Sequence, residues 1–155
     1  MATGTGQRLE DVAQDLFDVF TRLGLSTLRG RRRPGDLKEV EFLTLSILQA
    51  HGTMIVGDIQ RLLGVLPAQM SRIIRALENR ERPLIQCRIN ARDKRKVDVV
   101  LTVAGEKAFM EFQTNRVARL AERLRTLSDD DLDDLTSLGH KLNAMLERPG
   151  DHSAD

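Results

Sequence analysis

Apolar residues recur every three or four positions along most of this chain, the spacing that places them on one face of a helix. Asp36 and Thr102 are expected to cap the second and fifth of these helices. Ser128 with Asp131 forms a capping-box-like start for the last one. The pattern predicts six helices, at residues 7–28, 37–50, 56–63, 67–79, 103–125 and 129–147.

One stretch alternates with period two instead, which predicts a β-hairpin. Its strands are expected at residues 84–89 and 97–101, joined by a charged tip at residues 90–96. The apolar members of both strands should share one face: Ile85, Cys87, Ile89, Val97, Val99 and Leu101.

The predicted fold is mainly α with a small β-hairpin wing. Residues 37–105 would form a winged helix-turn-helix DNA-binding domain, with residues 67–79 as the recognition helix. Residues 7–28 and 106–147 would form a helical dimerisation region, because the small winged core is too short to cover their apolar stripes. Residues 148–155 are expected to be a disordered tail. The dimer interface is predicted at Leu9, Leu16, Phe20, Leu132, Leu135 and Leu142.

Charge is distributed unevenly, although the net charge is only +1. Residues 61–96 contain ten basic and three acidic residues, a net charge of +7. Residues 102–155 contain seven basic and eleven acidic residues, a net charge of −4. A concentrated positive segment in a nearly neutral protein indicates where a polyanion such as double-stranded DNA would bind.

Composition argues against several other classes. With five Phe and no Tyr or Trp, the chain offers few rings for stacking single-stranded bases. One Cys and three separated His provide neither a disulfide nor a metal site. No apolar run approaches the roughly 18 residues of a membrane span, and no signal peptide opens the chain, so a cytoplasmic location is expected. No phosphate loop or Cys/His pair indicates catalysis, so we expect no enzyme and no cofactor.

The wing and the helix after it resemble the MarR family of transcriptional regulators. Residues 93–96 read Asp-Lys-Arg-Lys, and Leu101-Thr102 with Gly105 follows the second strand. This is similar to the family's acidic-x-Arg-basic wing tip followed by Leu-Thr-x-x-Gly, and the resemblance covers nearly the whole chain. It implies a homodimeric DNA-binding regulator, usually a repressor, often released by a small phenolic or lipophilic ligand. A two-fold dimer would match a palindromic operator.

The DNA-binding residues are predicted on the recognition helix and the wing. Met70, Ile73 and Leu77, with Ile74, fit the buried side of the helix, which leaves its other side for base edges and phosphates. The resemblance implies that Arg95 enters near the minor groove, and Asp93 would hold it by a charge-assisted hydrogen bond. The predicted set is Ala68, Gln69, Ser71, Arg72, Arg75, Arg92, Asp93, Lys94 and Arg95. The alternative is a solvated basic surface.

Four further features of the sequence give additional predictions. A ligand cleft is predicted at Phe20, Phe42 and His51, or His51 only bonds local carbonyls at its helix end. Cys87 is expected to be an inert thiol on the core row, with redox activity as the alternative. Arg88 is expected to pair with Asp98 across the strands. The arginine-rich run at residues 29–33 would bind DNA or an acidic ligand, or remain solvated.

Two other functions compete with sequence-specific regulation. One is a protein-interaction module that kept the winged fold but lost DNA reading, which the missing Ser or Thr cap at Leu66-Pro67 favours. The other is an architectural protein that binds DNA without sequence preference. Salt-dependent preference for one palindrome over bulk DNA separates regulation from both.

Overall fold

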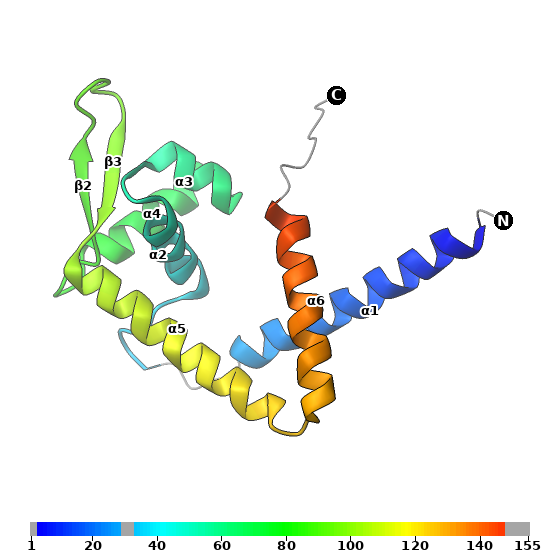
Figure 1. Ribbon diagram of the computed structural model, residues 1–155. Helices are drawn as coiled ribbons and strands as arrows, with labels where there is room; N and C mark the ends of the chain where they lie inside the picture. The colour runs from blue at the N-terminus through cyan, green and yellow to red at the C-terminus, as the bar shows by residue number, and fades with distance from the viewer. Residues whose placement is uncertain (1–2, 29–32, 148–155) are drawn as a thin grey trace. The chain divides into compact units, whose positions relative to one another are not determined.

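The computed structural model describes residues 3–28 and 33–147 (Figure 1). The chain divides into two compact units, Met1–Asp36 and Leu37–Asp155. The first contains helix α1 (Thr3–Leu28), which begins four residues before the predicted start at residue 7. No proline blocks this first turn, and the side-chain amide of Gln7 donates to Asp11 at 3.1 Å within the helix.

The second unit contains the winged helix-turn-helix that the sequence predicts. Every predicted element is present, with bounds within two residues of those expected. Its elements are α2 (Glu39–His51), β1 (Met54–Ile55), α3 (Val56–Leu63), α4 (Pro67–Glu78), β2 (Ile85–Ile89), β3 (Val97–Leu101), α5 (Val103–Leu124) and α6 (Asp129–Glu147). Strand β1 was not predicted, because two residues are too few for a periodic pattern. It pairs with β3, so the antiparallel sheet has the order β1-β3-β2.

The prediction that Asp36 caps α2 is wrong. The helix begins only at Glu39 with Lys38 as its N-cap, and the backbone N–H of Lys38 donates to the Glu41 carboxylate at 3.0 Å. Asp36 lies too far upstream to reach these donors and instead accepts from the backbone N–H of Arg33 at 2.6 Å. It therefore closes the turn before the helix.

The other two predicted caps are confirmed. The Thr102 hydroxyl accepts from the backbone N–H of Gly105 at 3.0 Å, at the start of α5. Ser128 and Asp131 form a reciprocal pair at the start of α6, in which each side chain accepts the other residue's backbone N–H at 3.2 Å. Both caps satisfy N–H groups that a helix end leaves without partners.

An aliphatic core holds α4 against α2, α3 and the sheet. Recognition helix α4 contributes Met70, Ile73 and Leu77, and all three are buried. This confirms the predicted inward side of the helix, with Ile74 half-buried beside it. The buried core residues are Leu45, Leu48, Ile59, Met70, Ile73, Leu77, Leu84, Ile85, Val99 and Phe109.

The hairpin leaves this core part of the way along its length. The register pairs Ile85 with Leu101 and Cys87 with Val99, as the predicted apolar row requires. Ile85 and Val99 are 1% and 0% exposed, but Ile89 is 71% exposed. The predicted row therefore faces one way, yet only its lower part is buried, and the tip projects past the helices (Figure 1).

The base of the wing is joined closely to the start of α5. The Thr102 hydroxyl donates to the carbonyl of Pro83 at 2.6 Å, and the Thr102 backbone N–H donates to the carbonyl of Leu84 at 3.1 Å. A Cβ atom on Gly105 would lie 1.9 Å from that Leu84 oxygen. This close approach is the physical reason for Thr and Gly in the Leu-Thr-x-x-Gly sequence. Among the described helices, none is both long and apolar enough to cross a membrane.

Candidate nucleic-acid interface

The outer side of α4 carries the predicted base-reading residues. Ala68, Gln69, Ser71, Arg72 and Arg75 are all exposed, opposite the buried Met70, Ile73 and Leu77. The helix starts with Pro67 at a first-turn position, and its N-cap, Leu66, provides no side-chain hydrogen bond. Burial of its apolar side therefore sets the orientation of this helix, although the usual polar N-cap is missing.

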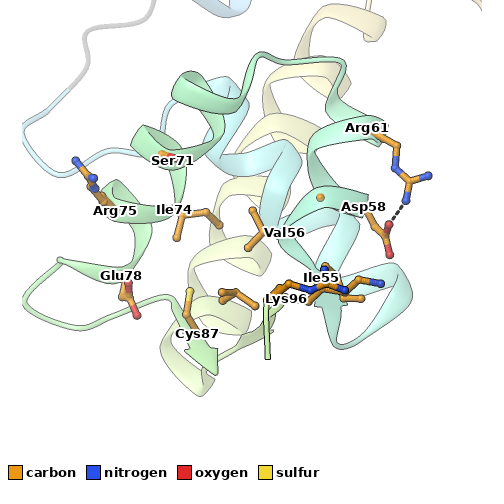
Figure 2. A pocket seen from close by; sticks show the side chains of 13 residues that line it. Ile55, Val56, Asp58, Arg61, Ser71, Ile74, Arg75, Glu78, Cys87 and Lys96 are labelled. Atoms are coloured by element: carbon orange, nitrogen blue, oxygen red, sulfur yellow. Dashed lines mark hydrogen bonds and ion pairs between the residues drawn. The ribbon is translucent and has the colours of Figure 1, made fainter. Parts of the chain in front are cut away.

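A hollow of about 740 Å³ separates α4 from the wing. Its polar edge includes Ser71 and Arg75 from α4 and Arg95 and Lys96 from the wing, while its floor contains Ile55, Val56, Ile74 and Val97. In Figure 2, Arg75 and Arg61 lie on opposite sides of this hollow, and Arg61 is paired with Asp58. Two of the predicted cations, Arg75 of α4 and Arg95 of the wing, thus border one surface depression, and apolar groups line its floor.

The wing tip confirms the predicted pairing of Asp93 with Arg95. The Arg95 Nε lies 3.3 Å from Asp93 Oδ1, and the same oxygen accepts the Arg95 backbone N–H at 3.1 Å. The Arg95 side chain is 91% exposed, so this contact orients the guanidinium without covering it. Arg92 and Lys94 are exposed on the same tip. The three cations are therefore accessible to a polyanion.

Asn90 organises this tip, and the sequence analysis did not single it out. Its side-chain oxygen accepts the backbone N–H groups of Arg92 and Asp93, both at 2.9 Å. Its side-chain nitrogen donates to Asp98 Oδ1 at 2.8 Å. The available signal was an Asn at the start of a turn, where its short amide commonly bonds the backbone two residues on.

The predicted Arg88–Asp98 ion pair is absent, although the two residues are register partners. Asp98 accepts from Asn90 at its Oδ1, and Arg88 donates to the side-chain oxygen of Gln86 at 2.7 Å. Asn90 of the tip therefore binds the Asp98 carboxylate that strand alternation had predicted as the partner of Arg88. Arg88 remains exposed on the outer face of the wing.

Cys87 lines the hollow and is half-buried. Burial, together with the charge and hydrogen bond of Glu78, raises the pKa of its thiol to about 11. The charged neighbour that acts on this thiol is the Glu78 carboxylate, which raises its pKa further. A protonated thiol favours the inert interpretation over redox activity.

The C-terminal end of α4 is tied to α2 by an ion pair that the sequence analysis missed. Arg80, just after the helix, donates to the Glu41 carboxylate at 2.8 Å, and Glu41 is 4% exposed. The Glu41 carboxylate also accepts the Lys38 backbone N–H. The two partners are 39 residues apart, so no local pattern indicates the contact.

The residues of the predicted ligand cleft have different environments. Phe42 stacks on Phe109 and Phe112, with ring centroids 5.4 and 4.4 Å apart. His51 lies nine residues later on α2, about 13 Å along the helix axis, and its Nδ1 is 3.0 Å from the carbonyl oxygen of Ile47. Its geometry fits the carbonyl-bonding alternative. Phe20 belongs to the first unit and is 59% exposed. The cleft stays a prediction.

None of the residues predicted at the dimer interface is buried in the structure. Leu9, Phe20 and Leu135 are exposed, and Leu16, Leu132 and Leu142 are half-buried. Helix α6 has no buried residue. Of the arginine-rich run, only Arg33 lies within the described residues, and the predicted tail at 148–155 lies outside them.

Known proteins share both the sequence pattern and this architecture. Residues 37–97 match the model of the MarR family. The chain is similar to the HTH-type transcriptional repressor MdtR of Bacillus subtilis, with 25% identity over 141 residues that cover 91% of this chain and 89% of MdtR.

Two solved structures have the same fold. The YusO protein of Bacillus subtilis has a TM-score of 0.67 at 25% identity, covering 89% of this chain and 96% of YusO. Bordetella bronchiseptica BpsR, whose DNA binding is regulated by 6-hydroxynicotinic acid, has a TM-score of 0.61 at 19% identity, covering 86% of this chain and 98% of BpsR. The matched domain, the similar repressor and the shared winged helix agree with the wing sequence, and residues 37–97 form a domain of the MarR family type.

Proposed function

We propose that this regulator is a homodimeric repressor that binds a palindromic site in double-stranded DNA through α4 and the wing. The observation that carries the proposal is the placement of exposed cations from both elements around one hollow. Segment 61–96 has a net charge of +7, which favours a polyanionic partner over a protein-interaction role. The similarity to a repressor supports the direction of regulation.

Gln69 and Arg72 are the proposed base readers. Both are exposed near the start of α4, the end that enters the major groove in helix-turn-helix proteins. A glutamine pairs well with adenine and an arginine with guanine, and each such contact discriminates by roughly 1–3 kcal/mol. Arg75 lies one turn further along and lines the hollow, so we assign it to a phosphate.

A binding titration tests the DNA proposal. Genomic fragments selected by the purified protein should share a palindrome, and binding to it should exceed binding to bulk DNA by about 10³-fold or more at physiological salt. Gln69→Ala and Arg72→Ala should flatten the preference at particular base pairs and leave binding to bulk DNA nearly unchanged. Equal affinity for all duplexes would favour the architectural alternative, and no binding would favour the interaction module.

The dimer proposal rests on the uncovered apolar stripes of α1 and α6. A second copy would bury them and would place two recognition helices about one turn of DNA apart. Sedimentation at micromolar concentration should give twice the chain mass of 17.4 kDa. A monomeric species at that concentration would contradict the proposal.

We also propose that a small organic ligand releases the DNA, by analogy with BpsR. Addition of an aromatic acid such as 6-hydroxynicotinic acid to the protein–DNA complex tests one ligand class directly. The expected result is a lower affinity for the palindrome. An affinity for the palindrome that the acid leaves unchanged would argue against aromatic acids as the ligand class.

A further inference from the structure

We propose that Asn90 is the positioning residue of the wing, which orders the tip so that Arg92 and Arg95 meet DNA in one preset arrangement. The inference deepens the proposed function and rests on it. Asn90 itself need not touch the DNA. Its side chain is half-buried beneath the tip, and each of its amide atoms is engaged within the protein.

Apolar packing does not hold the tip. Val99 on β3 is fully buried, but the next cross-strand pair on the same face toward the tip, Ile89 and Val97, is 71% and 37% exposed. Beyond this pair, the seven residues from 90 to 96 have no buried side chain. A hairpin end without core contacts is free to take several shapes unless polar groups select one.

Asn90 makes four hydrogen bonds that select one shape. Its backbone N–H donates to the carbonyl of Lys96 at 3.0 Å and closes the loop. Its side chain accepts from the backbone N–H groups of Arg92 and Asp93 and donates to Asp98 on β3. One residue therefore links both ends of the tip loop, its turn and the neighbouring strand.

Asn90 acts on Arg95 indirectly, through Asp93. Asn90 fixes the backbone N–H of Asp93, and the Asp93 carboxylate accepts the backbone and side-chain N–H groups of Arg95. The carbonyl of Asp93 also accepts the backbone N–H of Lys96 at 2.9 Å. Loss of the Asn90 amide would release this chain of contacts and leave every cation of the tip in the sequence.

A positioning residue and a contact residue differ in their salt dependence. Arg95→Ala removes a phosphate contact, so the slope of log affinity against log salt should fall by about one unit. Asn90→Ala keeps every cation, so its slope should stay at the wild-type value. Its affinity should nevertheless fall about tenfold, because binding must then order the tip, at roughly the cost of one or two net hydrogen bonds.

A paired exchange tests the geometry and keeps the charge constant. Asn90→Asp places a second carboxylate against Asp98 and should lower the affinity by about tenfold or more. Asn90→Asp with Asp98→Asn restores a donor facing an acceptor with no net change in charge, and should return the affinity to within about threefold of wild type. Ala91→Asp is the matched control, because it adds the same charge at an exposed neighbour outside the network.

The measurements are mobility-shift titrations with the selected palindrome at several salt concentrations, with melting temperatures to verify folding. The inference is overturned if Asn90→Ala binds like wild type, if its slope falls with its affinity, or if the paired exchange fails to rescue a folded protein. Failure of the wild-type protein to bind any duplex would instead overturn the proposed function. The two failures are distinguishable, because the first is measured on the variants and the second on the wild-type protein.

Discussion

The recognition helix and the wing tip border the same hollow, but different forces hold them in place. Helix α4 buries Met70, Ile73 and Leu77 in the aliphatic core, and the Arg80–Glu41 pair ties down its far end. The tip buries no side chain and depends on Asn90 and Asp93. One element is positioned by burial and the other by hydrogen bonds.

This difference has a consequence for dynamics. Opening α4 exposes core residues and therefore requires most of the free energy of unfolding, whereas opening the tip breaks only a few partly solvated hydrogen bonds. Helix α4 should therefore be held more firmly than the wing tip, whose single arrangement depends on a few hydrogen bonds. The expected effects of substitutions differ accordingly.

The largest effect should come from Leu77→Ala. Leu77 is fully buried at the base of α4, so its truncation should lower the free energy of unfolding by about 2–5 kcal/mol. Ile89→Ala is the matched control, because this apolar residue lies 71% exposed on the wing and should change the free energy by at most about 0.5 kcal/mol. Urea unfolding measures both. Equal losses would contradict the division between a buried helix and an unburied tip.

Gly105→Ala should have the next largest effect, because Gly105 lies at the junction between the base of the wing and the start of α5. The added methyl would lie 1.9 Å from the Leu84 carbonyl oxygen, so the backbone must move, at a cost of about 1–3 kcal/mol. Gly57→Ala in α3 is the control. Nothing lies within 4 Å of its Cβ position, and the substitution should stabilise by up to about 1 kcal/mol. Thermal unfolding of the two variants should therefore shift in opposite directions.

The fold was predictable because local patterns encode it. The three- and four-residue spacing in α4 and the alternation in β2 and β3 follow directly from which side chains the core buries. Strand β1 was missed because two residues form no pattern, and Asp36 was misassigned because Leu37 and Lys38 intervene before α2 begins.

The candidate site was predictable only in its exposed cations. Arg95 with Asp93 follows from a contiguous motif, so the pairing is readable. The Arg80–Glu41 contact depends on three-dimensional packing between distant helices. Asp98 has two possible partners in the sequence, Arg88 and Asn90, and only the shape of the tip decides in favour of Asn90. Where one acceptor meets two donors, alternation alone does not identify the bond.

Cys87 lies on the hairpin beside the hollow between α4 and the wing. Its reactivity should show where along the hairpin burial ends. The pKa of its thiol is raised to about 11 from an ordinary value of 9.0. At pH 8 the fraction of thiolate is therefore about a hundredfold lower than for an ordinary cysteine. Because a more basic thiolate is also a better nucleophile, alkylation should be slower by about tenfold rather than a hundredfold. Glu78→Gln should accelerate it, since that carboxylate raises the pKa. If iodoacetamide labels the wild-type protein as fast as it labels a free cysteine, Cys87 lies outside the buried part of the hairpin.

The smallest effect should come at the start of α6, whose cap, like the wing tip, is held by side-chain hydrogen bonds. The Ser128 hydroxyl and backbone N–H both donate to the Asp131 carboxylate and hold its pKa below the ordinary value of 3.8. A lowered pKa in the folded state means that the contribution to helix stability is present above pH 3.8 and is lost as the pH falls through the lowered pKa. NMR titration of Asp131 should therefore give a midpoint below 3.8 in the wild type and a higher midpoint in Ser128→Ala, because the hydroxyl is the largest cause of the shift. The variant should change little else, since neither side chain contacts the core. An Asp131 midpoint that Ser128→Ala leaves unchanged would show that exposed hydrogen bonds do not persist in solution, and would weaken the same reasoning for Asn90.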